Sequence, residues 1–422
     1  MTRTSSVVRR APGKLFVAGE YAVVEPGVPA VLVAVDREIT VTVSPLDGTG
    51  VEISSDLTAG PVRWHWAGGR LGPDTTHHHT NDTNDTNDTN DTNDTNDTSG
   101  GSGSSADSSG SSAGSGGGAG SGGGAGGGGG AGGGVRGALG HVVSAVETTA
   151  GLLAEHGVAA PAMSVRIESN LHDNGRKYGL GSSGAVTVAT VAAVAAFCGL
   201  DLPAGDRFRL AMLATARIDP KGSGGDLAAS TWGGWISYQA PDRDFVVDLA
   251  RRRGTAEALR TPWPHFAVRP LPPPAGLDFQ VGWTGSPAST ASLVASLHRR
   301  TWRHSPSHRA FVATSTGIVH AVADALGKGD GPGLLHQIRR ARSELARLDD
   351  EVGLGIFTTE LTALCDAAEA VGGAAKPSGA GGGDCGIALL PAPHDISQLR
   401  QRWAAAGVLP LPLDPAPERN PR

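Results

Sequence analysis

The stretch K-Y-G-L-G-S-S-G-A-V-T-V-A-T-V-A-A-V, residues 177–194, places a lysine and a glycine–serine loop directly before a run of small apolar residues. Glycines at this spacing let backbone N–H groups turn toward one point, and a following helix directs its positive dipole end there. A tight turn into a buried helix would explain the glycines, but neither the two serines nor Lys177. The stretch therefore predicts a phosphate-binding loop that leads into a helix.

The same glycines, Gly179, Gly181 and Gly184, match the G-x-G-x-x-G pattern of dinucleotide-binding domains. That pattern needs an apolar strand entering the loop and an acidic residue at the end of a second strand about 20 residues later. Here the loop follows the polar residues H-D-N-G-R-K-Y, and Asp201 stands at the end of the helical run itself. The dinucleotide interpretation is therefore disfavoured.

The composition is that of a soluble globular protein: 422 residues, 39% hydrophobic and 18% charged. Two domains are expected at this length. The net charge of −6 gives no global basic field, which disfavours nucleic acid and anionic membranes as partners. Three isolated cysteines without a C-x-x-C motif, and an N-terminus without an apolar signal region, suit a reducing cytosol. We expect a cytoplasmic protein, monomeric or homodimeric.

Residues 75–134 differ from the rest of the chain. They contain a His triplet, six consecutive N-D-T repeats and a long Gly/Ser/Ala tract. Almost nothing in this segment is apolar, so burial cannot offset the entropy of ordering it. We expect a disordered low-complexity insert.

Strand and helix patterns mix without regular alternation, which favours an α+β fold. Proline-rich sequence at 261–274 is typical of a connection, and the expected domains are 1–240 and 241–422. The expected strands are 30–43 (as one bent strand or two), 163–169, 231–238, 279–285 and 386–390. The expected helices are 139–156, the run after Ser183, 206–217, 288–300, 307–327, 333–349 and 359–371.

Two further stretches carry unusual patterns. A-P-G-K-L-F-V-A-G-E-Y-A-V-V, residues 11–24, separates a lysine from a glutamate by a strand-like apolar run. K-P-S-G-A-G-G-G-D-C-G, residues 376–386, is a second glycine-rich loop ahead of a strand. Either stretch alone is a weak signal.

Together and in this order, the three stretches resemble the three motifs of the GHMP small-molecule kinases. The resemblance spans residues 11 to about 390, apart from the insert. It implies an N-terminal domain like ribosomal protein S5 domain 2, a ferredoxin-like C-terminal domain and an active site between them. ATP and Mg²⁺ are the implied cofactors.

Within the family, four features resemble the phosphomevalonate enzymes. Gly19-Glu20-Tyr21 stands where mevalonate kinases carry G-E-H, and the stretches at 177–186, 224–234 and 282–290 are also similar. The implied reaction transfers the ATP γ-phosphoryl group to 5-phosphomevalonate, giving the 5-diphosphate and ADP. A phosphate monoester is mostly ionised at neutral pH, so this acceptor requires cations more than a strong base.

The resemblance implies a role for each matched residue. The residues expected to hold the ATP phosphates are Gly179, Leu180, Gly181, Ser182, Ser183, Gly184 and Ala185. Ser182 or Ser183 is expected near Mg²⁺. The expected catalytic residues are Lys14, Lys177 and Asp226, the last orienting the acceptor or Lys14. The expected substrate-binding residues are Lys14, Glu20, Tyr21, Lys177, Ser286, Ser289, Thr290, Ser378, Gly379 and Ala380.

Three alternatives stay open at this point. The chain could be a mevalonate kinase or another GHMP kinase with a hydroxyl acceptor. It could be a non-catalytic sensor with the same fold, although Lys14, Lys177 and Asp226 are all present. It could also be a nucleotide-binding structural protein. Acceptor-dependent ADP release separates the kinases from the last two.

Overall fold

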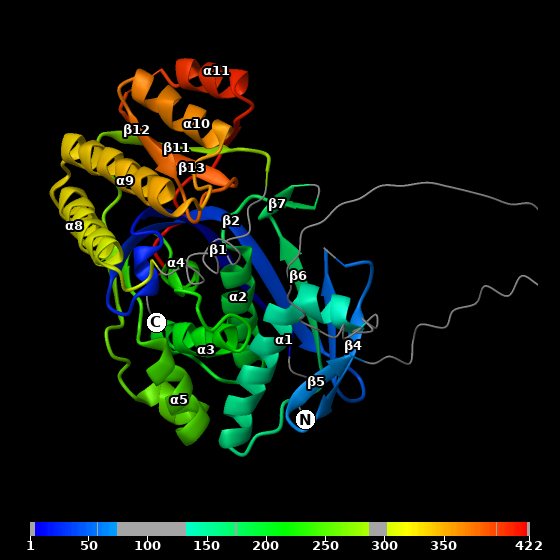
Figure 1. Cartoon of the computed structure of the whole chain (residues 1–422). Coiled ribbons are helices and arrows are strands. Elements are labelled where there is room, and N and C mark those ends of the chain that lie inside the picture. The colour runs from blue at the N-terminus through cyan, green and yellow to red at the C-terminus, as the bar shows by residue number, and fades with distance from the viewer. Residues whose placement is uncertain are drawn as a thin grey trace, which may run out of the picture. The chain divides into compact units, whose positions relative to one another are not determined.

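The computed structural model describes residues 5–56, 58–73, 132–173, 175–286, 302–393 and 395–419 (Figure 1). The chain divides into two compact units, Met1–Asp74 with Arg136–Arg422 and Thr75–Val135. Almost all of the second unit, and with it the insert expected at 75–134, lies outside the described residues. Only Gly132–Gly134 of that segment are described, as the start of a helix rather than part of the insert. The first unit is described below.

The larger sheet has eight strands in the order β10-β9-β2-β6-β3-β4-β5, with β1 paired to β2. Its strands are β1 (Val7–Ala18), β2 (Pro29–Pro45), β3 (Val51–Ser55), β4 (Val62–Ala67), β5 (Arg70–Pro73), β6 (Met163–Ser169), β9 (Trp235–Gln239) and β10 (Ala267–Leu271). A separate two-stranded hairpin joins β7 (His172–Asp173) to β8 (Arg176–Lys177).

Strand β2 is central to this sheet because its β-branched run is long enough to pair with β1, β6 and β9. One edge pairs with β1 along most of its length, while the other pairs first with β9 and then with β6. The region expected as one bent strand or two is therefore a single strand. Register shifts at Pro12/Gly13 and Phe16/Ala18 mark irregularities in β1, on either side of Lys14.

Helices pack against the larger sheet. They are α1 (Gly132–Glu155), α2 (Ser182–Phe197), α3 (Ala204–Ala216) and α4 (Gly225–Trp232), with α5 (Arg243–Arg253), α6 (Thr255–Arg260) and the short 3-10 helix η1 (Ala22–Val24) nearby. Helix α2 lies directly on β1 and β2. Its small side chains, among them Ala185 and Ala189, are fully buried, so the helix approaches the sheet closely.

The second sheet is antiparallel, in the order β12-β13-β11-β14. Its strands are β11 (Leu277–Trp283), β12 (Ala374–Pro377), β13 (Cys385–Pro391) and β14 (Leu409–Leu411), with helices α8 (Pro306–Lys328), α9 (Gly331–Val352), α10 (Thr359–Ala370) and α11 (Ser397–Ala405). Helices α10 and α11 form a core with this sheet around Leu364 and Trp403, at the top of Figure 1.

The structure confirms the mixed α+β class and most expected elements, it corrects two, and it leaves one untested. Thr231 and Trp232 end helix α4 instead of beginning a strand, because the chain turns only at Gly233 and Gly234. The proline-rich stretch contains β10. This is an edge strand, where Pro270 is tolerated because its missing N–H need not pair with a further strand. The helix expected at 288–300 lies outside the described residues.

The pairing of β10 with β9 bears on the domain boundary expected at residue 240. Residues 267–271 extend the larger sheet, and residue 277 begins the smaller one. We therefore propose a boundary between Leu271 and Leu277.

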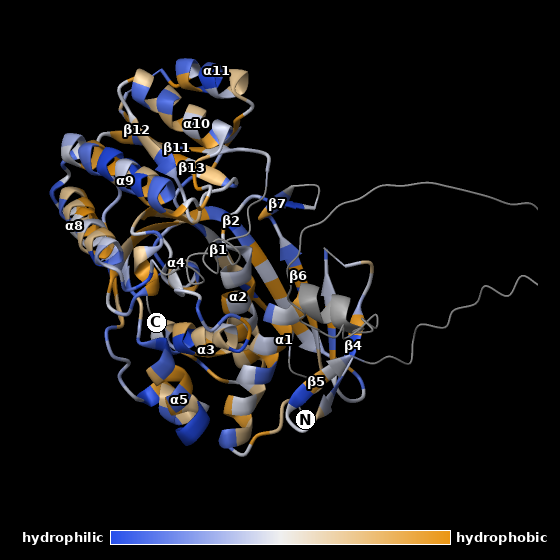
Figure 2. Cartoon of the chain, viewed as in Figure 1, coloured by the Kyte–Doolittle hydropathy of each residue, from blue (hydrophilic) through white to orange (hydrophobic). Residues whose placement is uncertain are grey.

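One helix among the described residues, α8, has the length and composition to cross a membrane. Its apolar side chains Phe311, Ile318 and Val322 are buried against the rest of the protein. Core helices of globular proteins meet the same criteria, so this finding is weak support for a membrane span. Figure 2 shows α8 and α9 with both apolar and hydrophilic residues.

Candidate active site

Strand β1 brings the three glycine-containing motifs together. The Lys14 backbone N–H donates to the Leu180 carbonyl at 2.8 Å, which attaches the 177–185 loop to β1. Further along β1, Ser378 Oγ accepts from the Phe16 N–H at 2.8 Å and donates to the Phe16 carbonyl at 3.0 Å. Two loops that are far apart in sequence therefore lie close to the same few residues of β1.

The loop after Lys177 ends at a helix whose first N–H groups have no side-chain cap. Gly181 is the N-cap of α2, in the left-handed conformation at φ 74°, and no acidic residue occupies the first turn. Left-handed backbone favours glycine, and uncapped N–H groups at a helix N-terminus favour an anion. The half-buried Ser182 and Ser183 begin this turn. The arrangement agrees with the phosphate loop expected from the sequence.

Lys14 and Asp226 both lie close to this helix start. Lys14 is 8% exposed, and its Nζ donates to the Gly179 carbonyl at 3.4 Å. A methyl group placed on Gly181 would lie 2.9 Å from Lys14 Cε and 3.3 Å from Asp226 Cβ. One placed on Gly184 would lie 2.5 Å from Asp226 Oδ2. A cation and a carboxylate thus adjoin the uncapped N-terminus, and the glycines leave room for both.

Lys177 is exposed on the short strand β8. Its charge nevertheless reaches His141 on α1, whose Nδ1 lies 3.4 Å from Thr187 Oγ1 on α2. Burial lowers the pKa of His141 most, Asp226 opposes that change, and Lys177 adds to it. The pKa of His141 therefore depends on the charges of both Lys177 and Asp226. Sequence reasoning did not single out His141.

This coupling gives a test of where Lys177 lies in solution. In Lys177→Met the pKa of His141 is expected to rise, because a nearby positive charge is removed. In Asp226→Asn it is expected to fall, because a stabilising negative charge is removed. Titration of the His141 ring by NMR measures both, with Lys328→Met on α8 as the control. An unchanged His141 pKa in Lys177→Met would place the Lys177 amine away from the loop.

Glu20, expected on the substrate side, forms a buried ion pair. Its carboxylate contacts the ammonium of Lys376, whose side chain is fully buried and also donates to the Pro377 carbonyl at 2.7 Å. The Gly379 N–H points to the same carboxylate oxygen at 3.5 Å. The pair joins the end of β1 to β12. Sequence reasoning missed Lys376, although a lysine among small buried residues of a strand was a usable signal.

Tyr21 makes a second connection between the same two motifs. Its side chain is buried, and its hydroxyl donates to the Ala380 carbonyl. Burial, followed by the charges of Asp349 and Glu20, raises the pKa of Tyr21 well above its usual value. The hydroxyl therefore stays protonated and acts as a donor. Tyr21 and Glu20 therefore both contact the glycine-rich loop of the third motif, at Ala380 and Gly379.

Asp384 connects the third motif to the phosphate loop. It is buried, has a left-handed backbone with φ 54°, and lies so near Gly179 that a methyl group there would be 2.3 Å from its Cγ. Its backbone N–H donates to the Ser286 carbonyl and its carbonyl accepts from the Thr284 N–H. Sequence reasoning gave Asp384 no role, since an aspartate after three glycines is typical of a turn.

Of the three substrate-binding residues expected within 282–290, only Ser286 is described. Its side chain is exposed, and its backbone is held by Asp384. Ser289 and Thr290 lie outside the described residues.

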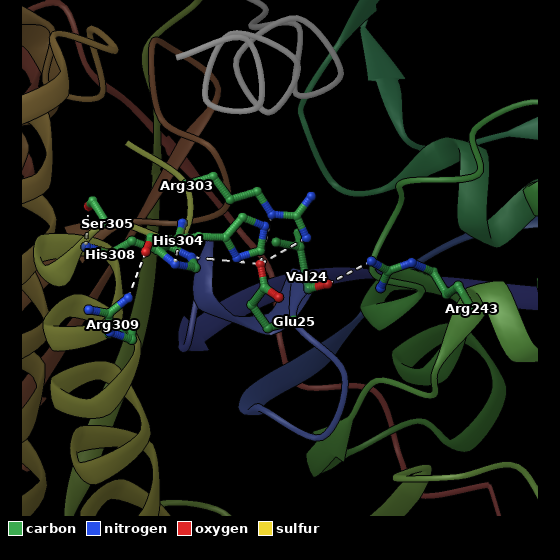
Figure 3. A network of polar contacts seen from close by, with 8 residues as sticks. All are labelled: Val24, Glu25, Arg243, Arg303, His304, Ser305, His308 and Arg309. Atoms are coloured by element: carbon green, nitrogen blue, oxygen red, sulfur yellow. Dashed lines mark hydrogen bonds and ion pairs between the residues drawn. The ribbon is translucent and has the colours of Figure 1, made fainter. Parts of the chain in front are cut away.

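A polar network secures the chain after β1 (Figure 3). Glu25 accepts from Arg303 Nε at 3.1 Å and Nη2 at 3.0 Å, and His308 Nε2 lies 3.7 Å away. Arg243 on α5 donates to the Val24 carbonyl at 2.6 Å. The network fixes residues 302–309 beside the end of the first motif, where Trp302 packs in the same cluster as Tyr21.

The part of the chain that the structure describes holds no group of three His, Cys, Asp or Glu side chains placed to bind a metal.

Comparison with known proteins identifies two family models, GHMP kinases N terminal domain at residues 141–234 and GHMP kinases C terminal at 323–409. A phosphomevalonate kinase of Streptomyces sp. (strain CL190) is 59% identical over 99% of both chains.

Two solved structures are similar over nearly the whole chain. The Lin0012 protein of Listeria innocua is 29% identical, with a TM-score of 0.76 over 97% of this chain and 98% of its own. Streptococcus pneumoniae phosphomevalonate kinase, in complex with phosphomevalonate and AMPPNP, is 24% identical, with a TM-score of 0.74 over 97% and 99%. At that identity the second likeness supports the fold alone. The ordered motifs, the two-sheet fold and the full-length relative together establish that this chain belongs to the GHMP kinase family.

Proposed function

We propose that this protein is a phosphomevalonate kinase, which transfers the γ-phosphoryl group of ATP to the phosphate of (R)-5-phosphomevalonate in the mevalonate route to isopentenyl diphosphate. The observation that carries the proposal is the 59% identity to a phosphomevalonate kinase across 99% of both chains. The convergence of all three motifs on β1 supports it.

The acceptor determines what the site must supply. A phosphate monoester has its second pKa near 6, so its attacking oxygen is mostly anionic at neutral pH. The obstacle is repulsion between two polyanions, and catalysis rests on positioning and charge neutralisation. Lys14, buried against the phosphate loop, is placed to neutralise charge between donor and acceptor. Lys177 adds positive charge from the exposed side.

The N-terminus of α2 is the proposed site for the ATP phosphates, bound by the N–H groups and hydroxyls of residues 179–185. Asp226 adjoins this turn, and we assign it to orienting Lys14 or the acceptor rather than to removing a proton. Oxygen ligands suit Mg²⁺, and the hydroxyls of Ser182 and Ser183 are its proposed protein ligands. When bound, Mg²⁺ would neutralise charge on the phosphates.

The deciding experiment measures ADP release by the purified protein with Mg²⁺-ATP and either 5-phosphomevalonate, mevalonate or homoserine. Release is expected with 5-phosphomevalonate alone. Release with mevalonate or homoserine alone would assign the protein to a hydroxyl-acceptor kinase and make Asp226 a true base. ATP binding without release for any acceptor would favour a sensor or a structural role.

The remaining expectations from composition and charge are compatible with this function. The partners are ATP and 5-phosphomevalonate, and we propose a cytoplasmic protein, monomeric or homodimeric, that binds neither nucleic acid nor membrane.

A further inference from the structure

A groove between α8 and α9 lies outside the site described above. Its volume is about 360 Å³, and its walls carry Thr314 and Ile318 from α8 and the α9 residues His336, Arg339, Arg340, Ser343, Glu344 and Arg347. We call it the α8–α9 groove. The two helices run side by side in Figure 1. A volume of this size suits a small metabolite.

The charge of the groove is positive. Three guanidinium groups face it against the single carboxylate of Glu344. Arg340 donates to the neutral side chain of Gln337 at 2.9 Å, and Arg339 to the Gly373 carbonyl at 2.6 Å. Among the described residues, the arginines of α9 that form ion pairs with carboxylates are Arg342 and Arg347 instead. The charges of Arg339 and Arg340 are therefore available to an anion from solution.

Two of the arginines lie on one line along α9 with other polar residues. His336, Arg340, Ser343 and Arg347 are spaced by four, three and four residues, which places them on one face of the helix. Thr314 contributes a hydroxyl from α8, and Ile318 is the buried apolar floor. Guanidinium groups with neighbouring hydroxyls are typical donors for phosphate oxygens.

Arg347 connects the groove to the interior. It contacts Glu344 at 2.5 Å and Glu351 at 3.7 Å. Glu344 is only 12% exposed, and it also lines a small cavity that reaches Gly19 and Glu20 at the end of β1. An anion that binds the guanidinium of Arg347 competes with the Glu344 carboxylate for it. This mostly buried carboxylate would then lose its ion-pair partner. Occupation of the groove thus alters the electrostatics beside the Glu20–Lys376 pair.

We propose that the α8–α9 groove is a regulatory binding site for a small phosphorylated or diphosphorylated metabolite. It is separate from the proposed ATP site, and its occupation acts on the end of β1 through competition for Arg347.

Inorganic pyrophosphate is the probe, and the readout is local to the groove. Ser343 is exposed, so Ser343→Cys can carry an environment-sensitive fluorophore. Burial raises the pKa of Cys198 to about 11 and of Cys365 to about 12, and Cys385 is fully buried, so the introduced thiol reacts first at neutral pH. The parent chain without Ser343→Cys, treated identically, gives the background.

Pyrophosphate is expected to change the fluorescence with saturation. Adding Arg340→Ala and Arg347→Ala is expected to weaken binding at least about tenfold, because two charged donors are lost. Arg251→Ala on α5, an exposed arginine paired with Asp248, should leave binding unchanged. Absence of a saturable change, or equal affinity after loss of Arg340 and Arg347, would overturn the proposal.

The regulatory part has its own readout. Pyrophosphate can also compete at the active site, so its effect on kcat and KM is compared in the parent and in Arg340→Ala/Arg347→Ala. An effect that disappears in the double variant belongs to the groove, and one that persists fully would refute regulation through Arg347. The fluorescence assay requires no turnover, so the binding site stands or fails independently of the proposed reaction.

Discussion

Replacing Lys14 by methionine is expected to lower kcat by about 10²–10³-fold, the range observed when one preorganised group that stabilises transition-state charge is removed. Lys14 is the buried cation nearest the phosphate loop, with its amine at the Gly179 carbonyl and its stem against Gly181. Methionine keeps an unbranched apolar stem of similar length but removes the charged amine. Steady-state kinetics with ATP and 5-phosphomevalonate measure the loss.

The control for this variant is Lys328→Met. Lys328 is exposed on α8 and pairs with Asp324 four residues earlier, so its removal should leave kcat unchanged. Thermal unfolding of both variants establishes that they are folded. A Lys14→Met protein that is folded and retains kcat within about threefold of the parent would rule out Lys14 as the main source of charge neutralisation.

Replacing Lys376 by methionine is expected to destabilise the protein by about 3–5 kcal/mol, because it leaves the Glu20 carboxylate buried without its cation. Lys376 is fully buried and Glu20 is 4% exposed, so water cannot replace the lost partner. The pair also fixes the third glycine loop to β1, and activity should fall with stability. Denaturant unfolding monitored by circular dichroism gives the change in free energy of unfolding.

A double variant separates the buried charge from packing. Adding Glu20→Gln to Lys376→Met removes the orphaned carboxylate, so much of the lost stability should return. The exposed Lys328→Met again serves for comparison and is expected to leave the free energy of unfolding nearly unchanged. If Lys376→Met is as stable as Lys328→Met, the buried ion pair does not hold the two motifs together.

Much of the fold follows from local patterns. Strand β6 at 163–169 has the expected bounds because its alternating side chains have one buried face, and α2 begins at the predicted glycine–serine loop. The prediction of a strand at 231–238 was wrong at its start, since T-W-G-G is compatible with either a helix end or a strand. Strand β10 was missed because two prolines flank and interrupt its short run.

The sequence alone determined the three motifs, their order, the uncapped start of α2 and the family they indicate, because each depends on residues adjacent in the chain. Only the tertiary structure decided which partner each charged side chain takes. Glu20 and Lys376 are 356 residues apart, and Asp384 meets Gly179 across more than 200. No local pattern encodes such contacts, because they form only when the loops of the smaller sheet pack against β1, a strand of the larger sheet, and against the loop at residue 179. The same packing makes Glu20 a buried structural anchor and places Lys14 and Asp226 at one helix N-terminus.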